Sequence, residues 1–115
     1  MLPSAGDIAW FDLDPVRGTE QAGRRPGMVV SELSYNELSV RILICPISKR
    51  EAPWPFNVRL PGGMRTTGVV LVDQVRMVDR PVRMFRAIEK APPGVLAEVR
   101  ARLAVLIGLQ VQERP

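Results

Sequence analysis

Three groups of polar residues interrupt the apolar stretches of this 115-residue sequence. They are Glu20-Gln21 with Arg24-Arg25, then Ser48-Lys49-Arg50, then Asp73-Gln74 with Arg76. Arginine presents a planar fork of N–H donors that matches phosphate or carboxylate oxygens, and a serine hydroxyl can add one hydrogen bond. The groups therefore predict a site for an anion, although their spacing alone also fits solvated loops and strand edges. The third group is the most informative, because a carboxylate and an amide interrupt an apolar stretch and need partners there.

The residue types that are missing limit the chemistry. The sequence has no histidine and one cysteine, Cys45, which excludes histidine acid–base catalysis and zinc sites of histidine or clustered cysteine. Proton transfer would have to use arginine, carboxylates, hydroxyls or the substrate itself. RNA supplies its own nucleophile, because its 2′-hydroxyl can attack the adjacent phosphodiester while the protein accepts a proton and stabilises the phosphorane. The residues alone thus indicate an anion-binding domain, with RNA cleavage as one option.

Charge and composition limit the classes of protein to which this sequence can belong. The net charge is +4, and fourteen arginines stand against two lysines. This balance predicts an anionic partner, either nucleic acid or an acidic protein segment, although GC-rich coding would also favour arginine. A hydrophobic content of 46% is typical of one globular domain, and no apolar run approaches the roughly 18 residues of a membrane span. The N-terminal MLPSAGD predicts no signal peptide, and Cys45 in the apolar run VRILICPI is expected to be a core residue of a cytosolic protein.

Alternating and β-branched patterns predict a mostly β (α+β) fold, a small antiparallel barrel with a C-terminal amphipathic helix. The expected strands cover residues 7–15, 27–33, 39–47, 56–60, 67–78 and 81–89. Polar or proline-rich loops are expected at 16–26 and 48–55, and a turn or single helical turn at 34–38. Residues 93–110 have helical period, with Leu96, Val99, Leu103, Leu106 and Ile107 in one stripe that is expected to be core. Residues 1–115 are expected to form a single domain.

Longer motifs add a family resemblance. The stretch GDIAWFDLDPVRGTEQAGRRPGMVVS, followed in order by CPIS, PWPFNVRL and RTTGVVLVDQVRMVD, resembles the MazF/PemK/Kid toxin family over essentially the whole chain. The resemblance implies an SH3-like barrel that forms a homodimer. It also implies a cytoplasmic endoribonuclease, free of metal and cofactor, that cuts single-stranded RNA to leave 2′,3′-cyclic phosphate and 5′-hydroxyl ends. A largely acidic antitoxin protein would hold the toxin inactive, and no membrane association is implied.

Family motifs also imply roles for particular residues. Arg25, before Pro26, matches the arginine that would stabilise the phosphorane or donate a proton. Ser48 stands where the family usually has threonine, so the hydroxyl is kept and the methyl lost. Glu20 matches a loop that gates the RNA groove and is a candidate base. Further RNA contacts are expected from Gln21, Arg24, Lys49, Asp73, Gln74 and Arg76.

Some positions leave alternatives open. Certain family members carry an arginine two positions before the aspartate of Asp-Gln as an acid, but Leu71 stands there in this chain. Arg24 fits either a phosphate contact or a solvated charge, and Trp54 fits either loop packing or base stacking. Trp10 is expected in the core or a dimer interface. The alternative functions are a CcdB-like gyrase poison, which the lack of a tryptophan near the C-terminus argues against, and an RNA-binding relative without activity.

Overall fold

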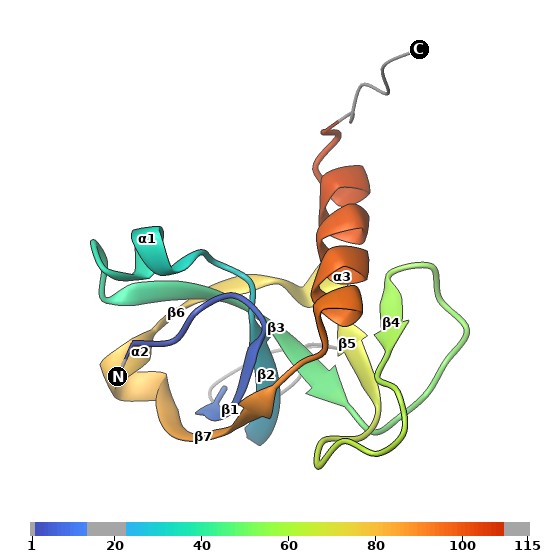
Figure 1. Cartoon of the computed structure of the whole chain (residues 1–115), viewed down its shortest axis with the longest axis horizontal. Coiled ribbons are helices and arrows are strands. Elements are labelled where there is room, and N and C mark those ends of the chain that lie inside the picture. Colours follow the sequence, from blue (N-terminus) through green and yellow to red (C-terminus); the bar gives the residue numbers. More distant parts are fainter. Residues whose placement is uncertain (1, 14–22, 110–115) are drawn as a thin grey trace.

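The computed structural model describes residues 2–13 and 23–109, in which seven strands and three α-helices occur (Figure 1). The strands are β1 (Asp7–Asp12), β2 (Arg24–Val29), β3 (Arg41–Ser48), β4 (Asn57–Arg59), β5 (Val69–Leu71), β6 (Arg76–Asp79) and β7 (Met84–Lys90). The helices are α1 (Leu33–Asn36), α2 (Arg80–Arg83) and α3 (Pro93–Leu106), with a 3-10 turn, η1 (Val72–Gln74), between β5 and β6. No helix among these residues is long and apolar enough to cross a membrane.

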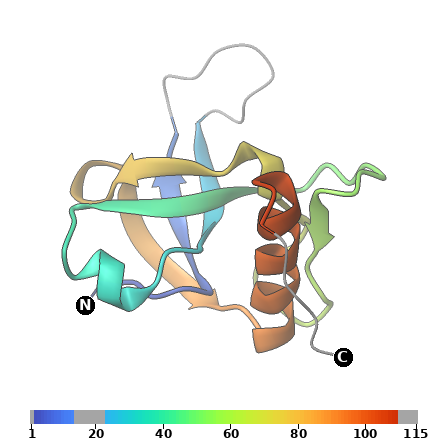
Figure 2. The same cartoon turned by 90° about the horizontal axis from the view of Figure 1, so that it is seen from above.

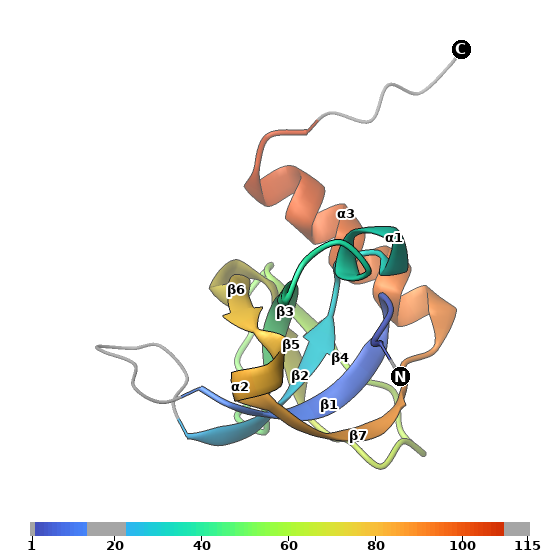
Figure 3. The ribbon, with the colours of Figure 1, turned by 90° about the vertical axis from the view of Figure 1, so that its left-hand side faces the viewer.

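All strand pairings are antiparallel, in the order β4-β5-β3-β2-β1-β7, with β6 also on β3. β3 is the centre of the sheet: its first half pairs with β6 and its last two residues pair with β5. This confirms the mostly antiparallel β class with a C-terminal helix, but the expected barrel is not closed. In the described part of the chain β7 pairs with β1 alone, and α2 joins it to β6 without a ladder (Figure 3).

The core has two apolar clusters on opposite faces of β1, β2 and β3. Alternation along the strands sends Ile8, Met28 and Cys45 into the cluster that α3 covers with Val95 and Val99. The neighbouring positions, such as Phe11 and Val29, fill the second cluster. Because both faces of these strands are buried, their sequences read as nearly continuous apolar runs.

Cys45 is confirmed as a core residue. Its side chain is fully buried, and it belongs to the cluster beneath α3. Burial, with a smaller contribution from the charge of Asp73, raises the pKa of the Cys45 thiol to about 12. The thiol therefore stays protonated at neutral pH and has no nucleophilic role.

The expected strand at 67–78 is wrong in one respect: the chain bends at Val72–Gln74 and forms two short strands. η1 shifts the register by three residues between the pairing of β5 with the end of β3 and the pairing of β6 with its first half, which an unbroken strand could not do. The expected strand at 81–89 likewise begins late, because Arg80–Arg83 form α2. Asp79 caps that helix by accepting a hydrogen bond from the Val82 backbone N–H at 3.2 Å.

α3 begins at Pro93 and ends before Gly108, whose φ of +75° suits glycine, as the sequence predicts. It lies beside β4 and η1, on the opposite side of the molecule from α2 (Figures 1 and 2). The predicted apolar stripe is only partly core. Val99 is buried, whereas Leu106 and Ile107 are 40% and 65% exposed because the last turn extends past the sheet.

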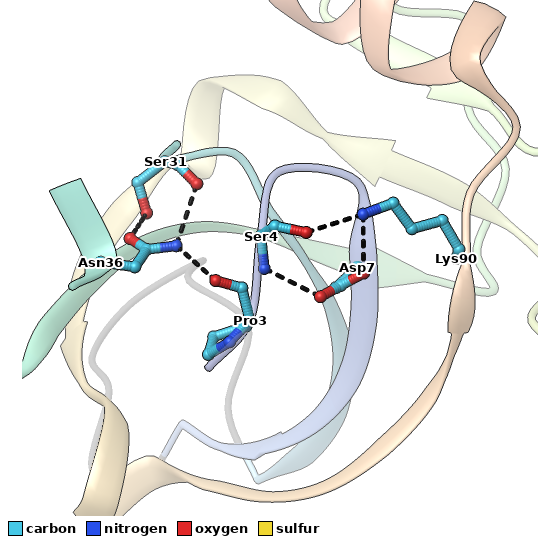
Figure 4. Close-up of polar contacts among 6 residues, drawn as sticks. All are labelled: Pro3, Ser4, Asp7, Ser31, Asn36 and Lys90. Carbon is cyan, nitrogen blue, oxygen red and sulfur yellow. Dashed lines mark hydrogen bonds and ion pairs between the residues drawn. The ribbon is translucent and has the colours of Figure 1, made fainter. Parts of the chain in front are cut away.

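The start of the chain is fixed by a polar network around Asn36, which is almost completely buried (Figure 4). The Asn36 side-chain amide donates to the backbone oxygens of Pro3 and Ser31 and accepts from the Ser31 hydroxyl at 2.6 Å. Lys90 extends the network by pairing with Asp7 at 3.0 Å. These contacts tie the N-terminal segment to α1 and β7, at the end of β1 remote from its pairing with Arg24 and Arg25.

Candidate functional site

Arg24 and Arg25 open β2 and are not part of the preceding loop, which corrects the predicted start of this strand. They pair with Asp12 and Phe11 of β1, and both are exposed. Phe11, the partner of Arg25, is fully buried in the second core cluster, so this end of the ladder is anchored through β1. Because Arg24 and Arg25 are both exposed, their side chains gave no apolar signal for a strand.

The register between β2 and β3 relates Arg25 to Ser48. The ladder between these strands ends at Gly27 and Pro46, and continuing its register by two residues sets Arg25 level with Ser48. Opposed residues of antiparallel strands project to the same face, with Cβ atoms about 5 Å apart when paired. The arginine and the serine, 23 positions apart in sequence, thus come from neighbouring strand ends.

Ser48 is buried, and its Oγ accepts a hydrogen bond from the Arg50 backbone N–H at 3.1 Å. This bond uses an oxygen lone pair and leaves the hydroxyl proton to be donated to a ligand. On its other edge Ser48 pairs with Val69, directly after Gly68. A Cβ on Gly68 would lie 2.1 Å from the Ser48 carbonyl oxygen, so only glycine permits this close approach.

A cleft of about 290 Å³ begins at Ser48 and is named the Ser48 cleft. Its polar lining combines part of the second group, Ser48 and Arg50, with part of the third, Asp73 and Gln74. Trp54 and Asn57 complete it. Leu71, at the position where some family members carry an arginine, also lines it. Arg25 is not part of this lining.

Asp73 is exposed and accepts a hydrogen bond from the Trp54 indole N–H at 2.9 Å. The indole also lies against Phe56, with ring centroids 5.8 Å apart. The loop-packing interpretation of Trp54 is thus supported by two contacts. Even so, 51% of this side chain is exposed, so about half of its surface remains accessible to a ligand.

Other predicted residues lie apart from the Ser48 cleft. Arg76 pairs with Ile44, four positions and about 13 Å along β3 from Ser48. The Arg24 guanidinium lies 5.0 Å from the centre of the Phe85 ring, a cation–π distance. Phe85 stacks in turn on Trp10 at 6.4 Å. Trp10 is only half-buried, so its expected placement in the core is wrong, while its placement in a dimer interface stays a prediction.

Lys49 lines a separate cleft of about 260 Å³, together with Trp10, Pro26, Arg65 and Thr66. The loop residues Arg65 and Thr66 were not predicted as site residues from the sequence, because no motif or spacing relates residue 65 to residue 49. Glu89 of β7 holds this loop in place. Its carboxylate accepts hydrogen bonds from the backbone N–H groups of Arg65 and Thr66 and, at 2.7 Å, from the Thr66 hydroxyl.

Replacing Glu89 with glutamine is expected to destabilise the protein at neutral pH and to matter less in acid. Burial raises the pKa of the Glu89 carboxyl, but the hydrogen bonds from Thr66 and Arg65, with the Arg65 charge, outweigh it and the pKa falls below its ordinary value. A lowered pKa gives stability that is present above the unfolded-state pKa and is lost as pH falls through the folded-state pKa. The loss of stability is measured as the decrease in Tm on thermal unfolding at pH 7 and at pH 3.

The matched control is Glu98→Gln, which removes only an exposed ion pair to Arg102 at 3.5 Å. Glu89→Gln should lower the Tm more than the control at pH 7, and the two should converge at pH 3. Equal Tm values for both variants at pH 7 would show that Glu89 does not hold the loop.

Two predicted residues, Glu20 and Gln21, lie outside the described part of the chain. Within residues 2–13 and 23–109, no three aspartate, glutamate, cysteine or histidine side chains gather where they could hold a metal ion.

A curved antiparallel sheet with a C-terminal helix, and an open polar cleft where β3 ends at Ser48, defines a class of small β proteins. Residues 4–107 match the family described as the PemK-like, MazF-like toxin of type II toxin–antitoxin systems. The chain belongs to this family.

Relatives and solved structures agree with this membership. The chain is 37% identical over 107 residues to the endoribonuclease toxin MazF of Escherichia coli K12, covering 93% of this chain and 96% of the relative. It is 35% identical over 108 residues to the endoribonuclease PemK of Escherichia coli, covering 89% and 80%. Among solved structures, MazF from Deinococcus radiodurans superposes with a TM-score of 0.88 at 40% identity, covering 94% and 98%. A MazE–MazF structure from the same organism matches at 0.79 and 35%, covering 96% and 100%.

Proposed function

We propose that this protein is the toxin of a type II toxin–antitoxin pair and an endoribonuclease that cleaves single-stranded RNA without a metal ion. The observation that carries the proposal is the Ser48 cleft, which begins at the end of β3 beside β2, the strand that carries Arg25. The curated relatives at 35–37% identity are endoribonucleases, and a solved relative is paired with MazE, which supports both parts.

In the proposed reaction the 2′-oxygen of the RNA attacks the adjacent phosphorus. A new phosphorus–oxygen bond forms, and the bond to the 5′-oxygen of the next nucleotide breaks, which leaves a 2′,3′-cyclic phosphate and a 5′-hydroxyl. The 2′-hydroxyl gives up its proton and the leaving 5′-oxygen gains one, so no other reactant is needed. Glu20 is the proposed base.

Arg25 stabilises the doubly charged phosphorane, or donates a proton, because its guanidinium presents several N–H donors to phosphate oxygens. Ser48 donates its hydroxyl proton to a second phosphate oxygen, since its Oγ is already positioned by the Arg50 N–H. Six further residues are proposed to bind the RNA: Gln21, Arg24, Lys49, Asp73, Gln74 and Arg76.

Two protein partners are proposed, a second copy of this chain and an antitoxin. The protein acts as a homodimer in the cytoplasm, and residues 1–115 form one toxin domain, which the family match over 4–107 supports. An acidic antitoxin suits a toxin of net charge +4, because opposite charges raise association rates and favour the correct partner.

Incubation of the purified protein with a long single-stranded RNA in EDTA tests the proposed class. We expect discrete cuts whose upstream fragments end in cyclic phosphate. Binding without cleavage would instead favour the RNA-binding alternative, and neither binding nor cleavage would leave the gyrase alternative to be tested on supercoiled DNA.

A further inference from the structure

Trp54 separates two clefts. On one side lies the Ser48 cleft; on the other lies a cleft of about 340 Å³, named the outer cleft, which Glu51, Pro53, Asn57 and Arg59 also line. Asn57 and Ala52 border both, so the two clefts are continuous around the indole. A chain that occupies the Ser48 cleft and continues past Trp54 has the outer cleft directly beside it.

The indole is both exposed and fixed, which is unusual for a tryptophan in a loop. It is 51% exposed, while its N–H is bound to Asp73 at 2.9 Å and one side of the ring lies against Phe56. Pro53 and Pro55 on either side restrict the backbone. A ring held in this way loses little conformational freedom when a flat ligand stacks on it.

The charges of the outer cleft fit a nucleobase better than a phosphate or an acidic peptide. Arg59 is paired with Glu51 at 3.3 Å, so the two side chains nearly cancel. Glu51 and Asp73 place carboxylates near the indole, which disfavours anions. The Asn57 amide nitrogen donates to the Ala52 carbonyl at 3.1 Å, which leaves the Asn57 carbonyl oxygen as an acceptor for a base edge.

We propose that the outer cleft is a nucleobase subsite in which a base of single-stranded RNA, adjacent to the cleaved linkage, stacks on Trp54. Glu51 and Asn57 accept hydrogen bonds from the edge of that base, and Asp73 is a positioning residue that holds the indole. The subsite rests on the proposed ribonuclease function. It adds three residues that determine specificity: Trp54, Glu51 and Asn57.

The first test uses fluorescence and leaves Trp54 intact. In Trp10→Phe protein Trp54 is the remaining tryptophan, because the sequence has two. The probe is an RNA oligonucleotide that spans a site cut in the EDTA assay, with a 2′-deoxy nucleotide at the cut so that it binds without reacting. Binding should strongly quench the Trp54 emission, since a base stacks on the ring. Binding, measured independently by mobility shift, without a change in emission would overturn the proposal.

The second test uses cleavage by Trp54→Ala, with Tyr35→Ala as the matched control. Tyr35 is an aromatic residue of α1, 42% exposed, and does not border either cleft. Loss of base stacking should raise KM about tenfold or more with a much smaller change in kcat. Sequenced cut ends should also lose base preference at one position beside the cut, while Tyr35→Ala keeps the wild-type KM and preference.

Trp54→Phe is the control for misfolding. It keeps an aromatic ring at this position and should retain most of the base preference. Because Asp73 is itself a proposed RNA contact, both Asp73→Ala and Asp73→Asn should raise KM. Asp73→Asn keeps an acceptor for the indole N–H and should retain more of the base preference than Asp73→Ala. A Trp54→Ala protein with wild-type KM and unchanged base preference would overturn the subsite even if cleavage itself is confirmed. Absence of cleavage by the wild-type protein would instead refute the proposed function, so the two failures are distinguishable.

Discussion

Arg25→Ala protein is expected to cleave RNA about 100- to 1,000-fold more slowly than the wild type, because one donor to the developing phosphorane charge is removed. Arg25 is exposed and belongs to neither apolar cluster, so the variant should fold normally. Most of the loss should appear in kcat, since the lost interaction is strongest in the transition state. The decrease in rate is measured by single-turnover cleavage of one RNA site.

The neighbouring Arg24→Ala variant is the matched control. It removes the same charge one position away, but the Arg24 side chain lies over Phe85 and not toward Ser48. We expect a modest increase in KM with little change in kcat, which also separates a phosphate contact from a solvated charge at this position. An Arg25→Ala protein that cleaves at the wild-type rate would remove Arg25 from the mechanism.

Gly68→Ala is expected to lower both stability and activity. Gly68 has a φ of +116°, and an added Cβ would lie 2.1 Å from the Ser48 carbonyl oxygen and 2.8 Å from the Ser48 carbonyl carbon. The backbone of β3 or β5 must move, at a cost in unfolding free energy of about 3 kcal/mol or more. Because the atoms that move belong to Ser48, the hydroxyl shifts as well, and kcat should fall even in the fraction that remains folded.

Gly63→Ala separates the two parts of this effect. Gly63 also has a positive φ, +89°, but no atom lies within 4 Å of its added Cβ. Its substitution should cost only the conformational strain, about 1 kcal/mol, and leave kcat unchanged. Urea unfolding combined with cleavage rates compares the two variants. Equal losses in both would show that the contact between Gly68 and Ser48 has no special importance.

The sequence predicted the elements whose side chains are buried in a regular pattern. β1, β3 and α3 were each located, because alternation or helical period follows directly from packing on a core. The break at Val72–Gln74 was missed because the sequence is mostly apolar on both sides of it, a pattern that fits a straight strand as well as a bent one. The last turn of α3 was wrongly assigned to the core, since periodicity shows which face is apolar but not whether a partner covers it.

Most residues of the candidate site were predicted from the sequence, but the contacts between them were not predicted. Register alone sets Arg25 level with Ser48, and register depends on strand pairing that single-sequence patterns leave open. The bond from Trp54 to Asp73 joins positions 19 apart through the bend at η1, which was itself unpredicted. Glu89 gave no signal, because its partners are mainly backbone N–H groups of a distant loop.

The most direct test of the proposed mechanism replaces one oxygen of the substrate. An RNA oligonucleotide that is cut at a single site is compared with the same oligonucleotide carrying a 2′-deoxy nucleotide on the 5′ side of that linkage, both in EDTA. We predict rapid cleavage of the first, with a cyclic phosphate end, and no cleavage of the second, which should still bind. Cleavage of the deoxy-substituted linkage would contradict attack by the 2′-hydroxyl and, with it, the proposed roles of Arg25 and Ser48.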